Sequence, residues 1–186
     1  MTTDLLVRSI ATLLSIGEVP PPVGELGEIH GFVRDHRAGN APTIHEIWTS
    51  AYAGCWETWS PEFAERRIYN PVDGVLVTEK GRRDELPVTP GQKRSFPPAV
   101  QLAFPLRLPI WGRQPIDTWR MTEASSSGME TTIELRRLHG EKDTGKLLLH
   151  ESGLPRALQT PDRTLELLEW EPLFAHPDFW WGANRA

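Results

Sequence analysis

Residues 130–151 read ETTIELRRLHGEKDTGKLLLHE. In the first part of this stretch, Ile133 and Leu135 alternate with polar residues, which is the period of two of a β-strand with one apolar face. Residues 146–151 repeat the apolar pattern after a polar segment that is rich in turn-forming residues. We therefore predict two antiparallel strands joined by a solvent-exposed turn.

That turn also contains the first part of a phosphate-binding loop, G-x-x-x-x-G-K, at residues 140–146. The next residue is Leu147, where the motif needs a Ser or Thr hydroxyl to hold Mg²⁺. A strand rather than a helix is predicted to follow, so no helix N-terminus would meet a phosphate. We predict a plain hairpin turn without nucleotide affinity and with Lys146 in solvent.

Strand-like segments bounded by Gly and Pro occur on both sides of this hairpin. The turn signal Asp73-Gly74 joins two of them. Residues 82–96 are polar and interrupted by Pro and Gly, which indicates an exposed loop. The predicted strands outside the hairpin are 28–37, 43–50, 54–60, 65–71, 74–80, 116–122 and 163–170.

Helical patterns occur in two places. Residues 1–17 carry an apolar stripe that includes Leu6, Ile10 and Leu13, and residues 98–104 can form one or two helical turns. Short connections between strands favour antiparallel pairing. The predicted class is α+β: a curved, mostly antiparallel β-sheet whose concave face is covered by the N-terminal helix and the short central helix.

Length and composition indicate one globular domain over residues 1–186, with 39% hydrophobic and 24% charged residues. Within it we expect the N-terminal helix at 1–17, a Pro-rich linker at 18–24, a sheet domain at 25–170 and an aromatic tail at 171–186. These ranges divide one domain and do not mark separate ones.

Charge, cysteine content and hydropathy argue against several classes of protein. A net charge of −5 argues against nucleic-acid binding, which needs an excess of cations. A single cysteine, Cys55, excludes an internal disulfide or a Cys-rich zinc module and is predicted to be a core residue. No apolar stretch approaches the roughly 18 residues of a spanning helix. The start lacks a basic, apolar signal sequence, so a cytoplasmic location is expected.

The eight tryptophans allow two interpretations: a thick aromatic core, or an aromatic-lined cavity. No catalytic or nucleotide-binding motif accompanies them. We therefore predict a non-enzymatic binding module for a lipid or hydrophobic small molecule, held between sheet and helices without a cofactor, metal site or catalytic residue. The ligand-binding candidates, chosen because they lie in predicted sheet or sheet-edge segments, are Trp48, Trp56, Trp59, Trp111 and Trp119.

Two other functions stay open. In the C-terminal tail, Phe179, Trp180 and Trp181 are typical anchors for a protein partner or a second copy of the chain, unless the tail docks on its own domain. A hydrolase or a metal-dependent enzyme is the third possibility, with a site that uses His30, His36 or His45. The first two share a strand face, and the three imidazoles with Glu28 or Glu46 could hold a metal.

Several short motifs resemble the LolA, LppX and RseB-like carriers. They are WETWSP (56–61), IYNPVDGVLV (68–77), WGRQPIDTW (111–119) and DTGKLLL (143–149), within a span of residues 54–170. The opening helix at 4–16 and the Pro-rich helical stretch at 96–108 belong to the same resemblance. The resemblance implies a curved antiparallel sheet with helices filling its concave side. Those carriers are exported, often with a lipidated Cys near the start, and this chain shows neither feature. The fold therefore carries over more safely than the export role.

Overall fold

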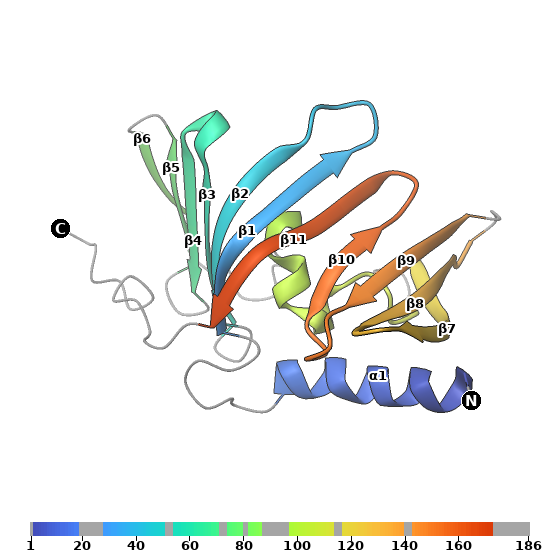
Figure 1. The fold of residues 1–186 in the computed structure, drawn as a ribbon. Coiled ribbons are helices and arrows are strands. Elements are labelled where there is room, and N and C mark those ends of the chain that lie inside the picture. Colours follow the sequence, from blue (N-terminus) through green and yellow to red (C-terminus); the bar gives the residue numbers. More distant parts are fainter. Residues whose placement is uncertain are drawn as a thin grey trace.

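A single open, antiparallel sheet dominates the structure, a computed structural model (Figure 1). The structure describes residues 2–18, 28–50, 54–70, 74–79, 82–86, 97–113, 117–139 and 143–172. Eleven strands of this described part lie in the order β6-β5-β4-β3-β2-β1-β11-β10-β9-β8-β7. The predicted antiparallel sheet is thus confirmed.

Most strands follow one another closely in sequence, whereas β6 and β7 are far apart. In the described part of the chain, three 3-10 helices (η1–η3) occur between strands. The elements are α1 (Thr2–Glu18), β1 (Glu28–Arg37), β2 (Thr43–Ser50), β3 (Cys55–Ser60), η1 (Pro61–Phe63), β4 (Glu65–Asn70), β5 (Gly74–Glu79), β6 (Arg82–Leu86), η2 (Pro98–Ala103), η3 (Pro105–Arg107), β7 (Trp119–Ser127), β8 (Glu130–Arg137), β9 (Thr144–Leu149), β10 (Pro155–Gln159) and β11 (Arg163–Pro172).

The sheet consists of two meanders, β1–β6 and β7–β11, that meet where β1 pairs with β11. Gly31 lies at this junction. A Cβ atom there would sit 2.6 Å from the carbonyl oxygen of Glu169 and 3.0 Å from the Cβ atom of Trp170. Only glycine therefore allows the two strands to approach so closely. A register shift follows directly, between Phe32 and Val33.

The strands bury one face, called here the inner face. In β2, Ile47 is fully buried, whereas Ile44 is 38% exposed on the opposite, outer face. The buried apolar residues of the two meanders join in one cluster, which is the hydrophobic core. Its strand residues include Ile29, Val33, Ile47, Trp56, Ile133, Leu135, Leu147, Leu149, Leu158, Leu165 and Leu167.

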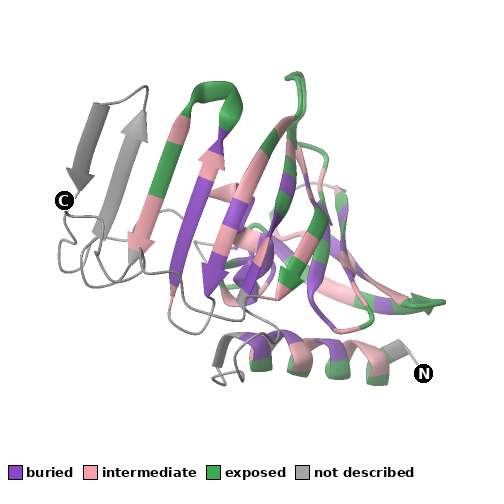
Figure 2. Ribbon diagram, turned by 60° about the vertical axis from the view of Figure 1, so that its left-hand side comes forward, coloured by how far each residue is buried: buried purple, intermediate pink, exposed green. Residues whose placement is uncertain are grey.

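Helix α1 lies along the ends of the strands of the second meander (Figure 1) and contacts β7 and η3. Leu13 and Ile16 point into the core, and the helix is buried on the side that faces the sheet (Figure 2). The central helix is η2, a 3-10 helix that contacts β1, β2, β10 and β11. The nearby Pro105 and Pro109 prevent a longer helix.

Three sequence-based boundaries need correction. Residues 82–86 form strand β6, paired with β5, rather than an exposed loop, because an edge strand tolerates charged side chains. Strand β10, which begins at Pro155, was not predicted; proline is permitted at the first residue of a strand. The strand predicted at 116–122 is β7, which begins three residues later and ends five residues later. The linker at 19–24 and the tail from 173 onward lie outside the described residues.

The predicted hairpin of residues 130–151 is confirmed, since β8 and β9 pair antiparallel with Ile133 opposite Leu147. Arg137 donates a hydrogen bond of 2.7 Å to Asp143 at its turn end. Lys146 is exposed but lies 3.4 Å from a carboxylate oxygen of Glu134, so it is not free in water as predicted. Residues 140–142 lie outside the described part of the chain.

Two substitutions on one strand test the assignment of faces. Ile47→Ala should lower the free energy of unfolding by about 2–5 kcal/mol, because it leaves a cavity in the core. Ile44→Ala, the matched control on the outer face, should cost less than about 1 kcal/mol. Urea denaturation measures both. Equal losses at the two positions would contradict the assignment.

Candidate functional site

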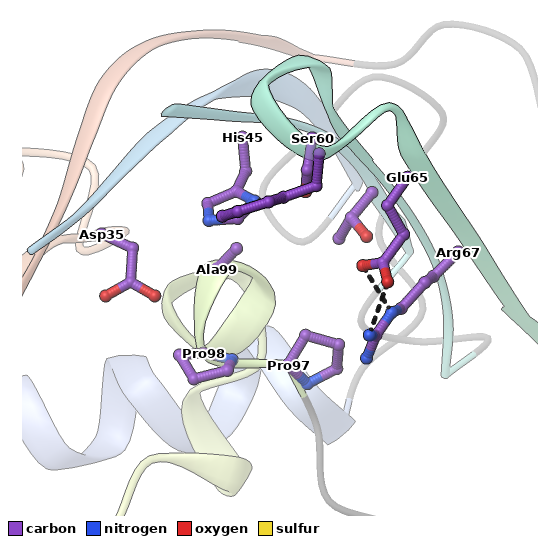
Figure 3. A pocket seen from close by; sticks show the side chains of 10 residues that line it. Asp35, His45, Ser60, Glu65, Arg67, Pro97, Pro98 and Ala99 are labelled. Carbon is purple, nitrogen blue, oxygen red and sulfur yellow. Dashed lines mark hydrogen bonds and ion pairs between the residues drawn. The ribbon is translucent and has the colours of Figure 1, made fainter. Parts of the chain in front are cut away.

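A cavity of about 350 Å³ lies between the inner face of β1–β4 and the start of η2 (Figure 3). Strands supply a polar wall, and Phe63 with the η2 segment supplies an apolar wall. We call it the His45 pocket. Its lining residues are Asp35, His45, Thr58, Ser60, Phe63, Glu65, Arg67, Pro97, Pro98 and Ala99.

Strand alternation explains why polar groups gather here. His45 lies two residues before the buried Ile47 and therefore on the same, inner face. On the neighbouring strand pair, Thr58 is opposite Arg67, and Ser60 is opposite Glu65. The inner face thus changes from apolar to polar at the end of the sheet where these strands extend beyond the core.

His45 is the centre of the pocket. Its Nδ1 atom lies 2.7 Å from the hydroxyl oxygen of Ser60, and Figure 3 shows the ring between Asp35 and Ser60. Burial lowers the pKa of His45, although the nearby Asp35 carboxylate acts in the opposite direction. A neutral imidazole at pH 7 follows. Within the described part of the chain Nε2 has no hydrogen bond, so it can serve a ligand as donor or acceptor.

The charged groups around the pocket are paired. Asp35 accepts two hydrogen bonds of 2.7 Å from the guanidinium of Arg163. Arg67 and Glu65 form an ion pair at 2.8 Å. With His45 neutral, the polar wall therefore carries both signs of charge in balance and offers hydrogen-bonding groups rather than a net field.

The five predicted tryptophan sites do not share one wall. Trp56 and Trp119 are buried in the core, and Trp111 packs against the core at its edge. Trp56 lies opposite Thr49 on the inner face. Trp48 is one residue before Thr49, and Trp59 is three residues after Trp56, so strand alternation places both on the outer face. None of the five lines the His45 pocket.

Two further predictions concern the aromatic C-terminal tail and Cys55. Phe179, Trp180 and Trp181 lie outside the described residues, so the interaction role of the tail stays a prediction. Cys55 is buried, as predicted for a core residue, and burial raises the pKa of its thiol to about 11.

The three histidines proposed for a metal lie on two faces. His30 pairs with Trp48 on the outer face, where His36 also lies, whereas His45 is on the inner face. One metal ion cannot reach all three, so this ligand set is corrected. Within the described residues, no group of three or more His, Cys, Asp or Glu side chains is placed to hold a metal ion.

His30 is held between two carboxylates. Its Nε2 atom lies 2.9 Å from Glu46, and its Nδ1 atom lies 3.1 Å from Glu171. Burial alone would lower the pKa of His30, but the hydrogen bonds to Glu171 and Glu46 raise it above the ordinary value. The two strand histidines are therefore shifted in opposite directions.

Comparisons with known proteins give little beyond the fold. No protein-family model matches the chain, and no curated protein matches it. Among solved structures it is similar to MucB, with 17% identity and a TM-score of 0.39 over 92% of this chain and 59% of MucB. The chain thus spans less than two thirds of MucB.

A LolA superfamily protein from Nitrosomonas europaea is similar with 10% identity and a TM-score of 0.35, over 92% of this chain and 96% of that protein. The short sequence motifs also resemble the LolA family. The structural similarity is faint, as the sequence similarity is, and it concerns the fold alone. Within the described residues, no helix combines the length and apolar character needed to cross a bilayer.

The opposite pKa shifts predict opposite pH effects on stability. The pKa of His45 is lowered in the folded protein, so below its ordinary value of 6.5 the unfolded chain binds more protons and stability falls. The pKa of His30 is raised, so its contribution is present below 6.5 and is lost as pH rises through the higher folded value.

We therefore expect acidification from about pH 7.5 to about pH 5.5 to cost His45→Gln less stability than the wild type, and His30→Gln more. Urea denaturation at the two pH values measures the difference. The same pH dependence in all three proteins would refute both assignments.

Proposed function

We propose that this protein is a non-enzymatic binding module that holds a small amphipathic molecule with an uncharged polar head in the His45 pocket. The observation that carries the proposal is the cavity itself, which has a polar strand wall and an apolar wall from Phe63, Pro97 and Ala99. Its volume of about 350 Å³ suits a small ligand, since such sites commonly measure about 300–1,000 Å³.

Charge balance favours an uncharged head. Because Asp35 and Glu65 each have a guanidinium partner, a charged head would have to displace one of these ion pairs or stay unpaired, which is costly in a confined site. The neutral pair of His45 and Ser60 offers hydrogen bonds without that cost. Hydroxyl, amide and ester groups are the matching head chemistry.

The apolar wall favours a short alkyl chain. Pro97 and Pro98 are half-buried, Ala99 is buried at the start of η2, and Phe63 is 50% exposed. A ligand that covers Phe63 would remove apolar surface from water, which is favourable in proportion to the area. A wholly apolar ligand would bury the imidazole of His45 without a partner for Nε2. The proposal therefore narrows the predicted hydrophobic ligand to a lipid-like amphiphile.

A serine-dependent acyl transferase is a second candidate, favoured by the hydrogen bond between Ser60 and His45. In that reaction, the Ser60 oxygen would add to the carbonyl carbon of an ester while His45 took its proton. The ester C–O bond would then break, and the alcohol would leave with the proton returned by His45. Ser60 is only 3% exposed, and Asp35 is held by Arg163 rather than by the imidazole. We therefore place binding first. Hydrolysis of p-nitrophenyl butyrate that disappears in Ser60→Ala would reverse this order.

The binding proposal is tested with 1-decanoylglycerol by isothermal titration calorimetry. His45→Phe keeps a ring in place but removes its hydrogen bonds, so affinity should fall by about tenfold or more, the effect of one lost polar contact. The matched control, His36→Phe, lies exposed on the outer face and should bind like the wild type. Decanoate and decyltrimethylammonium should bind about tenfold more weakly than the glycerol ester.

Undetectable binding of 1-decanoylglycerol to the wild type would overturn the proposal. Equal binding to His45→Phe would also do so, because the head would then lie elsewhere.

A further inference from the structure

We propose that the outer face of the sheet docks an arginine-bearing segment of another protein. The surface consists of neighbouring positions on β2, β1 and β11, on the side of the sheet opposite the His45 pocket. We call it the acidic-aromatic patch. Its residues are His30, Phe32, Glu46, Trp48, Glu169 and Glu171.

Strand register brings these side chains together. His30 lies opposite Trp48 on β2 and opposite Glu171 on β11. Phe32, two residues on, lies opposite Glu46 and Glu169. Aromatic and acidic groups therefore alternate over three adjacent strands.

The aromatic part is ordered and accessible. The ring of His30 stacks on Trp48, with centroids 4.9 Å apart and planes inclined by 10°. Phe32 is 36% exposed although it is a large apolar residue. Phe32 is tilted by 55° against the ring of His30, and a partly exposed aromatic surface of this kind suits a planar cation.

The acidic part consists of Glu46, Glu169 and Glu171. His30 contacts one oxygen of Glu46 and one of Glu171, and within the described residues no Arg or Lys pairs with these two or with Glu169. The side chain of Glu171 is 72% exposed.

Two carboxylates elsewhere on the outer face do have such partners. Arg34 lies 2.8 Å from Glu166, and Arg66 pairs with Glu57. In the described part of the chain, the patch thus brings together three carboxylates, those of Glu46, Glu169 and Glu171, that have no Arg or Lys partner, and this arrangement favours a cationic occupant.

A hollow of about 240 Å³ lies at the patch, and its lining includes His30, Phe32, Glu169 and Glu171. It borders Gly31, the residue without a side chain at the β1–β11 junction. A guanidinium there can stack on an aromatic ring and bind a carboxylate through two parallel hydrogen bonds. Lysine provides the charge but not the planar geometry. Arginine is therefore the anchor that fits both parts of the patch.

The test uses the full-length protein and the peptide acetyl-Arg-Arg-Arg-Arg-amide in isothermal titration calorimetry. The matched peptide contains citrulline, which keeps the shape of arginine but lacks its charge. Glu169→Gln/Glu171→Gln removes two patch charges. Its control, Glu123→Gln/Glu151→Gln, makes the same change in net charge at exposed positions outside the patch.

We expect the arginine peptide to bind the wild type and the control alike, and to bind the patch variant about tenfold more weakly. The citrulline peptide should show no binding. Affinity should also fall as salt is added, because the attraction lies at the surface.

Three results would overturn the proposal. One is the absence of arginine-peptide binding at millimolar concentration. Another is equal weakening in the patch variant and the control, which would indicate attraction to net charge alone. The third is a dimer in analytical ultracentrifugation that the patch substitutions dissociate, because a second copy of the chain would then be the occupant.

Discussion

The pairing of β1 with β11 joins two meanders that are otherwise built from neighbouring hairpins, and the rest of the structure depends on it. Gly31 allows this pairing, because a side chain there would meet the backbone of Glu169. The same pairing brings Arg163 to Asp35, which balances the charge of the His45 pocket. It also brings Glu171 to His30 on the opposite face. Both proposed surfaces therefore rest on one contact between distant parts of the chain.

Because side chains alternate along β1 and β2, these two strands carry different groups on the two faces of the sheet. On the inner face, His45 is half-buried near balanced charges, and its pKa is lowered. On the outer face, His30 lies between Glu46 and Glu171, and its pKa is raised in spite of burial. The inner site is thus neutral and hydrogen-bonding, whereas the outer patch is acidic and aromatic. A small amphiphile and a cationic protein segment suit the two faces respectively.

Sequence analysis predicts the local elements well and the distant contacts poorly. The bounds of β1 and β2 are predicted to the residue, because Gly and Pro flank clear strand patterns. Periodicity also places His30 and His36 on one face. It does not reveal that β11 pairs with β1, because strand partners far apart in sequence leave no local pattern. The pocket residues Asp35, Ser60 and Glu65 were missed for a different reason, because each is ordinary until β1, β3 and β4 pack against the distant η2 segment.

The most direct test of this account is the free energy of unfolding of Gly31→Ala. In an unconstrained strand, alanine should stabilise the protein by about 0.5–1 kcal/mol relative to glycine. The new Cβ atom would instead lie 2.6 Å from a backbone oxygen of β11, so the account predicts a loss of about 1–3 kcal/mol. Unchanged or increased stability would contradict the close approach of β1 to β11 on which the pocket and the patch depend.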